Sequence, residues 1–362
     1  MAAGVWKDTG SITRRLYDGG VPAPSSRRRL TAIGALAAVL GVAALVWQLW
    51  GVGPEEIAAQ IYRVRWGFPV ILALGGLRFA LRAMAWSLCV APPARLKFTD
   101  AFAAVLSGDT IGNLTPFGPL VSEPAKAAFV RGRMDLTAGI TALAVENLFY
   151  TLSAAAMIAA GTIALLFSFE LPGDLEYASE VALVIIFGMF AAVAWVLWRR
   201  PALVSRTLGL FARSGGATRW ERLQRLEHEV YSFSSRRTDV LLPVVAAEIA
   251  FHALGVVEIY VTLTLLQGAA PSLLLAFVLE GANRLINVIF KFVPLKAGVD
   301  EAGTEALTAI LGYSAGFGAT LALVRKARMI VWSLVGSVLL VRHGLSARRI
   351  LQDTQLARAR DI

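Results

Sequence analysis

The chain has 362 residues, of which 57% are hydrophobic and only 17% are charged. A soluble globular domain carries about 25% charged residues, and several apolar runs here reach the roughly 20 residues that a helix needs to cross a bilayer. These features exclude an ordinary soluble domain and predict an all-α, polytopic helical membrane protein. The formal net charge of +10 would suggest nucleic acid for a soluble protein. The positive-inside rule explains it better in a membrane protein, so we expect no nucleic-acid partner.

The N-terminal part of the chain reads as a basic tail followed by two membrane helices. Residues 1–29 hold six Lys and Arg residues and are predicted to be a flexible cytoplasmic tail. A membrane helix is expected at about 30–50, and a short amphipathic helix on the outer surface at 54–65. The next helix, at about 67–90, carries Arg78 and Arg82 on one face. Two readings stay open for these arginines: structural contacts with other helices, or binding of an anionic head group.

The stretch 109–131, DTIGNLTPFGPLVSEPAKAAFVR, interrupts the apolar pattern with glycines, prolines and charges. We expect helices at 98–114 and 121–132 on either side of a break at Pro116, Gly118 and Pro119. Ser122 is a candidate cap for the second helix, with Glu123 and Pro124 in its first turn. Broken backbone at membrane depth is tolerated only where it is buried in protein or lines a cavity, so this stretch predicts a functional site.

The middle of the chain is predicted to contain three further membrane helices, at about 136–169, 181–197 and 240–266. Glu146 lies in the first of them and needs a partner, because a buried charge is costly. An acidic loop is expected at 170–180. Residues 199–238 hold nine arginines, and an amphipathic helix at 213–235 is predicted to bind anionic lipids of the inner leaflet. Glu248 and His252 share one helix face, and either a hydrogen bond between helices or a proton relay is compatible with them.

A second broken stretch, NRLINVIFKFVPLKAGVDEAGTE at 283–305, has the same character as the first. Helix is expected at 272–292, then a break that contains Pro294 and Gly298, and a short helix at 299–312. The last membrane helix is predicted at 316–341, followed by a basic cytoplasmic tail at 342–362. Arg325 and Arg328 lie within that last helix and are expected to face the protein interior. They cannot form a loop, because the remaining residues would be too few to span the bilayer.

The distribution of basic residues predicts the orientation. Of the 35 Lys and Arg residues, 24 fall in segments assigned to the inside, so both termini are expected in the cytoplasm. The first broken stretch then starts and ends inside, and the second starts and ends outside. This indicates an inverted repeat with a site near the midplane, within one domain at 30–341 of about eight membrane segments. Re-entrant and fully crossing hairpins stay open as alternatives.

Both broken stretches resemble the signatures of a flippase-like membrane family that includes the membrane region of lysylphosphatidylglycerol synthases. The likeness covers roughly 30–341. It implies translocation of a lipid or a lipid-linked head group, and it does not imply aminoacyl-transferase activity, because we expect the soluble transferase domain to be absent. The residues that match are Asn113, Pro116, Gly118, Glu123, Lys126, Pro294, Gly298, Val299 and Glu301, with Trp332 and Gly336 in the last helix. The chain departs from the family pattern at Ser122, Lys296 and Asp300.

We predict a polar cavity between the two breaks, in which basic side chains hold a phosphate-like head group. Carboxylates there would balance the cations or take up protons. The alternative is that these charges form packed ion pairs that only hold the breaks in shape. No metal and no cofactor are expected. The candidate substrate-binding residues are Asn113, Glu123, Lys126, Glu146, Asn283, Lys291, Lys296, Asp300, Glu301, Glu305, Arg325 and Arg328.

The function predicted from these patterns is a transporter of the cytoplasmic membrane, a flippase for a lipid or lipid-linked anionic head group. Two alternatives stay open. One is a membrane-embedded enzyme that acts on lipid head groups, for which the sequence offers neither a metal-ligand set nor a nucleophile. The other is a non-transporting scaffold of a lipid-synthesis complex. Membrane lipids are the expected partners, and a homo-oligomer stays open.

Overall fold

The computed structural model describes residues Glu55, Ala59, 62–115, 118–130, 133–134, 136–199, Phe233, 237–290, 293, 296 and 298–360. The predicted tail at 1–29, the helix at 30–50 and most of the basic segment at 199–238 lie outside these residues. From 343 onward only the backbone is described. The described part of the chain is helical, with no strand, which confirms the all-α prediction.

The helices follow the apolar runs and stop where proline and glycine interrupt them. Four of those described are long and apolar enough to cross a membrane: Gly67–Cys89, Thr137–Ser168, Gly173–Val196 and Thr238–Gln267. The chain is therefore a multi-pass helical membrane protein. In chain order the main helices are α4 (Gly67–Cys89), α5 (Phe98–Leu114), α6 (Gly118–Phe129), α7 (Leu136–Ser168), α8 (Gly173–Arg199), α11 (Thr238–Gln267), α12 (Leu273–Ile289), α13 (Val299–Ile310) and α14 (Phe317–Arg360).

Three predicted boundaries are wrong. The second helix of the first hairpin, α6, begins at Gly118, so Ser122 is an interior residue and Pro124 lies inside the helix. The acidic segment expected as a loop is the start of α8, where Asp174 and Glu176 occupy the first turn and stabilise the helix dipole. The C-terminal tail continues α14 to Arg360 as helix, because no proline or glycine-rich turn follows residue 341.

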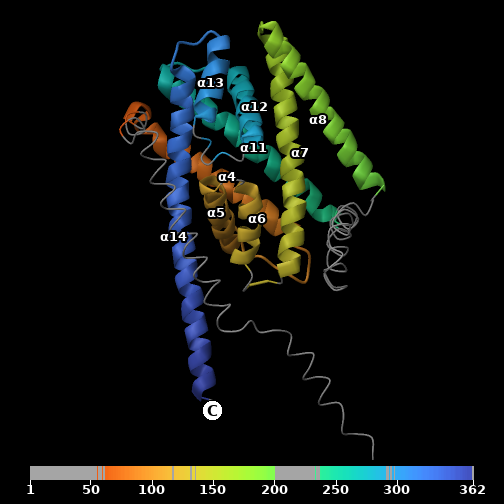
Figure 1. The fold of residues 1–362 in the computed structure, drawn as a ribbon, viewed down its shortest axis with the longest axis vertical. Helices are drawn as coiled ribbons and strands as arrows, with labels where there is room; N and C mark the ends of the chain where they lie inside the picture. The colour runs from red at the N-terminus through yellow and green to blue at the C-terminus, as the bar shows by residue number, and fades with distance from the viewer. Residues whose placement is uncertain are drawn as a thin grey trace, which may run out of the picture.

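The centre of the molecule is the antiparallel pair α4 and α11, which pack closely along their lengths. At one end, a Cβ atom on Gly67 would lie 2.1 Å from Leu265. At the other end, Arg237 donates a hydrogen bond to the Val90 carbonyl oxygen at 3.1 Å. Both helices run diagonally behind α12 and α7 in Figure 1. This pair joins the first half of the chain to the second.

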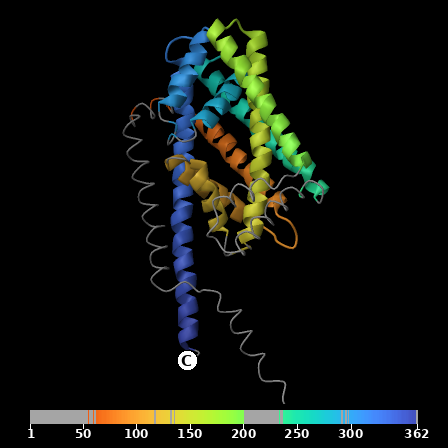
Figure 2. The same cartoon turned by 45° about the vertical axis from the view of Figure 1, so that its right-hand side comes forward.

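Two helical hairpins lie on opposite sides of this central pair. In Figures 1 and 2 the α5–α6 hairpin occupies the lower half of the molecule and the α12–α13 hairpin the upper half. The long helix α14 packs against both α5 and α13. Its Trp332 donates a hydrogen bond to the Leu72 carbonyl oxygen of α4 at 3.1 Å.

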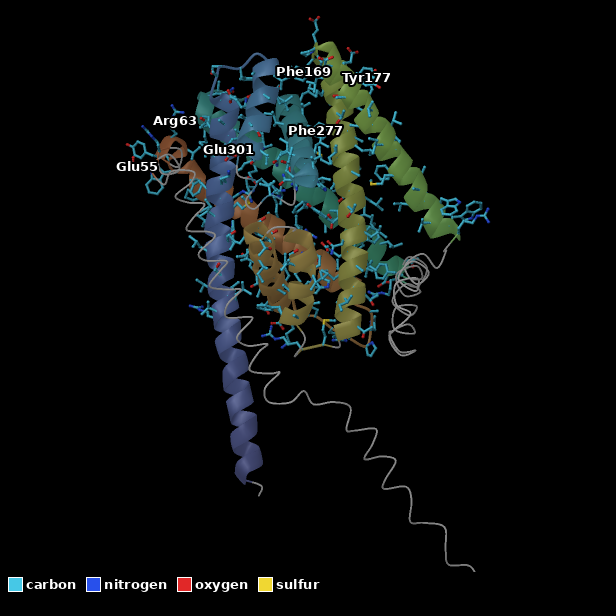
Figure 3. The ribbon with its side chains drawn as sticks, viewed as in Figure 1. Glu55, Arg63, Phe169, Tyr177, Phe277 and Glu301 are labelled. Atoms are coloured by element: carbon cyan, nitrogen blue, oxygen red, sulfur yellow. The ribbon has the colours of Figure 1, made fainter. Side chains whose placement is uncertain are left out.

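The remaining helices, α7 and α8, form one side of the molecule. Helix α7 crosses α12 at Gly161 and Gly281, where a Cβ atom on either glycine would lie about 3 Å from the Cα atom of the other. Helix α8 packs chiefly against α7. Phe169 and Tyr177, labelled in Figure 3, lie at the end where the two helices connect. From there α8 diverges from the other helices, as Figures 1 and 2 show.

Candidate functional site

A cavity of about 730 Å³ lies at the centre of the molecule. Asn113 and Gly118 line it from the first break, and Val293 and Lys296 line it from the second. Two interruptions separated by more than 170 residues in sequence therefore border one space. Such a volume is typical of a small-molecule site, which spans about 300–1,000 Å³.

Cationic side chains dominate the polar lining. Among the described residues, eight cations and three carboxylates border the cavity. Some of the balancing carboxylates lie behind the cations, so that positive charge faces the cavity and negative charge faces the protein. The cations are Arg78, Arg82, Lys126, Arg284, Lys296, Arg325, Lys326 and Arg328, and the lining carboxylates are Asp109, Glu123 and Asp300.

Three arginines share two glutamates in the cluster formed by Arg78, Arg284, Arg328, Glu258 and Glu280. Arg78 donates to Glu258 at 3.1 Å and lies 3.6 Å from Glu280. Arg328 Nε is 2.7 Å from Glu258 Oε1, and Arg284 Nε donates to Glu280 at 2.7 Å. Both glutamates are almost fully buried and do not line the cavity. With all five groups ionised, this three-arginine cluster carries one uncompensated positive charge.

A second network connects α4, α6 and α7. The Arg82 guanidinium donates to both oxygens of Glu146, at 2.9 and 3.1 Å, and to Asn147 at 3.3 Å. Asn147 donates in turn to Glu123 at 2.7 Å, which also accepts from Lys126 at 2.7 Å. The two cations and two carboxylates balance. Glu146 thus has the partner that its burial requires.

A third set of ion pairs fixes α13 to α14. Arg325 donates to Asp300 at 2.9 Å and to Thr304 at 2.7 Å, and Lys326 pairs with Glu301. The second oxygen of Glu301 accepts the backbone N–H of Gly298 at 2.9 Å, at the start of α13. Arg325 and Lys326 are buried, as predicted for basic residues inside the last helix.

Lys296 differs from the other cavity cations. Within the described part of the chain, no carboxylate lies within 4.0 Å of its ammonium group. Its φ of 51° is in the left-handed region, which is costly for a residue with a Cβ atom. Unfavourable backbone conformations of this kind cluster at ligand sites. Lys296 therefore presents an unpaired positive charge to the cavity from a strained position.

Aromatic rings hold three of the guanidinium groups in place. The Phe251 ring lies 4.5 Å from Arg78 and 4.9 Å from Arg284, measured from ring centroid to guanidinium carbon. The Tyr150 ring lies 4.0 Å from Arg82 in the same way. These cation–π contacts orient the planar groups without neutralising them.

The structure brings together most of the residues predicted to bind substrate, while their role stays a prediction. Glu146 and Glu301 lie behind the cavity surface and pair with the lining residues Arg82 and Lys326. Glu305 does not line the cavity; its carboxylate accepts the backbone N–H groups of Gly316 and Ala319, at 2.6 and 2.9 Å, near the start of α14. The residues that line the cavity are Asn113, Glu123, Lys126, Asn283, Lys296, Asp300, Arg325 and Arg328.

Some predicted positions lie outside the described residues. These are Lys291 and the break residues Pro116 and Pro294, together with the side chain of Pro119. The other two break residues are placed. Gly118 starts α6 on the cavity surface, and Gly298 has a φ of 81° directly before α13.

Sequence reasoning missed the centre of the three-arginine cluster. Arg284 and its partner Glu280 were not among the candidates, although they are four residues apart in a mainly apolar helix. That spacing is the signal for an intrahelical ion pair, and an ion pair at membrane depth marks a candidate site. Glu258 and Asp109 were missed as well, because their partners are distant in sequence or are not charged.

The pair Glu248 and His252 lies outside the cavity lining. The two residues share Ser153 of α7, whose hydroxyl lies 3.2 Å from Glu248 and 3.1 Å from the His252 Nε2 atom. These contacts join α11 to α7 and favour the reading as a hydrogen bond between helices over the proton relay.

The model of one protein family, the lysylphosphatidylglycerol synthase TM region, matches residues 33–336. This match contains both breaks, all the helices from α4 to α13 and the buried basic residues of α14. No curated protein and no solved structure matches the chain at a significant level. The match covers well over half of the chain, and the chain belongs to the family of the lysylphosphatidylglycerol synthase transmembrane region.

Proposed function

We propose that this protein is a flippase that moves a lipid or lipid-linked anionic head group across the cytoplasmic membrane. The observation that carries the proposal is the cavity of about 730 Å³, whose polar lining holds eight cations from both halves of the chain among the described residues. Guanidinium and ammonium groups bind phosphate through strong charge-assisted hydrogen bonds. A head group bound there would cross the membrane interior in a polar environment.

The arrangement of the hairpins supports a path from both sides. The α5–α6 hairpin and the α12–α13 hairpin occupy opposite halves of the molecule, and both breaks reach the cavity. We infer that they enter from the cytoplasmic and outer faces respectively, as an inverted repeat does. Rocking of one half against the other would expose the bound head group to each face in turn.

The sharpest test is Lys296→Asn in protein reconstituted in liposomes with a labelled anionic lipid. Lys296 has no ion-pair partner within 4.0 Å among the described residues, so its removal leaves none of their carboxylates newly unpaired. Asparagine also accepts the left-handed conformation at this position better than lysine does. We expect transport to fall by about 10- to 100-fold, because a hydrogen bond to a charged group contributes about 1.5–3 kcal/mol and each 1.4 kcal/mol is about tenfold.

The matched control is Arg63→Gln, which removes an exposed cation that Figure 3 shows at the edge of the molecule. Its transport should equal that of the parent. Thermal unfolding should show Lys296→Asn to be at least as stable as the parent. If no anionic lipid crosses faster than in protein-free liposomes, the proposed function is wrong. Parental transport by Lys296→Asn would remove Lys296 from the binding site.

A further inference from the structure

The cavity has an apolar part as well as a cationic one. Helix α12 contributes to both, and its residues change character around the helix. At 100° per residue, Asn283, Asn287 and Arg284 occupy one sector, and Leu285 and Val288 follow in the next. All five line the cavity. The polar sector points to the head-group side, and the apolar sector continues toward α7 and α8.

Helices α7 and α8 complete the apolar part. Ile158 of α7, with Ala182, Ile185 and Met189 of α8, lines the cavity. Buried Ile186 holds α8 against α7 by packing with Ile158 and its neighbours. Only 6% of the most apolar part of α8 is buried, so within the described part of the chain no other helix covers the outer side of α8.

The exposure of the lining residues shows where the cavity is open. Ile185 on α8 is 66% exposed, and Val288 and Ile289 on α12 are 49% and 50% exposed, although all three line the cavity. By contrast, Arg284 on the polar side of α12 is only 6% exposed. Among the described residues, the cavity therefore opens sideways between α8 and α12, along apolar side chains at the depth of the membrane helices.

We propose that this opening is a lateral portal for the hydrocarbon chains of an anionic lipid whose phosphate is held by the three-arginine cluster. The proposal rests on the proposed function and specifies its substrate as a lipid rather than a water-soluble anion. Two features select this ligand together. The cluster supplies one uncompensated positive charge for the phosphate, and the adjoining α7, α8 and α12 side chains remove hydrocarbon from water and keep it in contact with the membrane.

The test compares two probes with the same head group, dioleoylphosphatidic acid and glycerol 3-phosphate. The full chain is titrated with each in detergent, and binding is measured by native mass spectrometry. The portal variant is Ile185→Trp combined with Val288→Trp, which fills the opening from both helices. We expect its affinity for phosphatidic acid to fall about tenfold, the equivalent of about two displaced methylene groups. Its affinity for glycerol phosphate should stay at the parental value.

Two further variants calibrate the result. Val184→Trp adds the same bulk beside Ile185 at a residue that is 73% exposed and does not line the cavity, so neither probe should be affected. Arg284→Gln should weaken both probes, because both need the phosphate site. Thermal unfolding shows whether each variant folds. If the double Trp variant does not fold, Ile185→Trp alone is tested, and we expect it to lose affinity for phosphatidic acid and to keep the parental affinity for glycerol phosphate.

The portal is overturned if the Trp variant binds phosphatidic acid as the parent does, if it weakens both probes equally, or if the parent binds neither. These outcomes are separate from failure of the proposed function. If the parent protein shows the expected binding pattern but moves no lipid across the liposome membrane, the portal proposal stands and the proposed transport function is wrong.

Discussion

Individual charges in the cavity differ in how they are compensated, and this decides what each substitution would do. Arg82 and Glu146 form a bidentate pair in which the glutamate is 2% exposed. Removing one member of a buried pair leaves an uncompensated charge, which costs about 3–5 kcal/mol. Removing both members costs much less, because no buried charge is left without a partner.

We therefore expect Arg82→Gln and Glu146→Gln each to lower the free energy of unfolding by about 3–5 kcal/mol, and the double variant to recover much of that loss. Thermal unfolding in detergent, analysed as a double-mutant cycle, measures this coupling. The control is the Arg133–Asp100 pair, where Arg133 is 45% exposed at the side chain. Breaking that pair should cost about 0–1 kcal/mol. Additive losses in the buried pair would contradict the ion-pair interpretation.

At the scale of elements, the α7–α12 crossing fixes the spacing of the two helices beside the cavity. Gly161 and Gly281 bring the two backbones into direct contact. One turn further along α12, Arg284 and Leu285 already line the cavity. The crossing thus sets how far apart the walls of the cavity lie at that end.

Gly281→Val should destabilise the protein, because a Cβ atom at this position would lie 3.0 Å from the Gly161 Cα atom. Forcing extra carbon into a packed contact costs about 1–3 kcal/mol, measurable as a lower thermal midpoint. Gly188→Val on α8 is the matched control, since a Cβ atom there meets nothing within 4 Å. Equal midpoints for the two variants would show that the crossing tolerates a larger separation.

At the scale of the whole molecule, the antiparallel α4–α11 pair predicts which turns share a side of the membrane. The turn after α4 lies beside the start of α11, as the hydrogen bond from Arg237 to Val90 shows. The turn after α11, at 268–272, lies at the other end. The positive-inside rule predicts that the first turn lies in the cytoplasm and the second outside.

The single cysteine, Cys89, makes this orientation testable in a Cys89→Ala background. Ala269 is exposed, and the Ala269→Cys variant should react with a membrane-impermeant maleimide in spheroplasts, whose cytoplasmic membrane is intact. Exposed Ala91→Cys should react only after permeabilisation. The opposite pattern would invert the orientation, and labelling of both from outside would contradict the antiparallel arrangement relative to the membrane.

The sequence predicted the helices better than it predicted the site. Apolar runs and their breaks placed α4, α5, α7 and α11 to within a few residues, because membrane helices need continuous apolar length. The boundaries failed where the first turns of a helix carry no distinctive period, as in the Gly-Pro start of α6 at Gly118 and the acidic start of α8 at Gly173. Arg325 was correctly placed inside the protein by the argument that the remaining length of the last helix could not span the membrane.

The pairing of charges was beyond the sequence. Glu258 contacts Arg78, which is 180 residues away, and no local pattern connects the two. The same holds for Arg82 and Glu146, whose contact depends on how α4 and α7 cross. Glu305 shows the converse error, since an acidic residue near the second break serves a helix N-terminus instead of the cavity. Only local pairs can be read from spacing, such as Glu280 with Arg284 (i,i+4) and Glu123 with Lys126 (i,i+3).

The sharing of glutamates across the chain has a consequence for assembly. Arg78 comes from the first half of the sequence, whereas Glu258, Glu280, Arg284 and Arg328 all come from the second. If the chain were divided between α8 and α11, the N-terminal fragment would insert with Arg78 separated from its carboxylate partners, whereas Glu258 and Glu280 would keep Arg328 and Arg284 within the C-terminal fragment. Because an unpaired charge is costly in hydrocarbon, the pairing of Arg78 with these glutamates should favour reassembly of the two fragments in the bilayer.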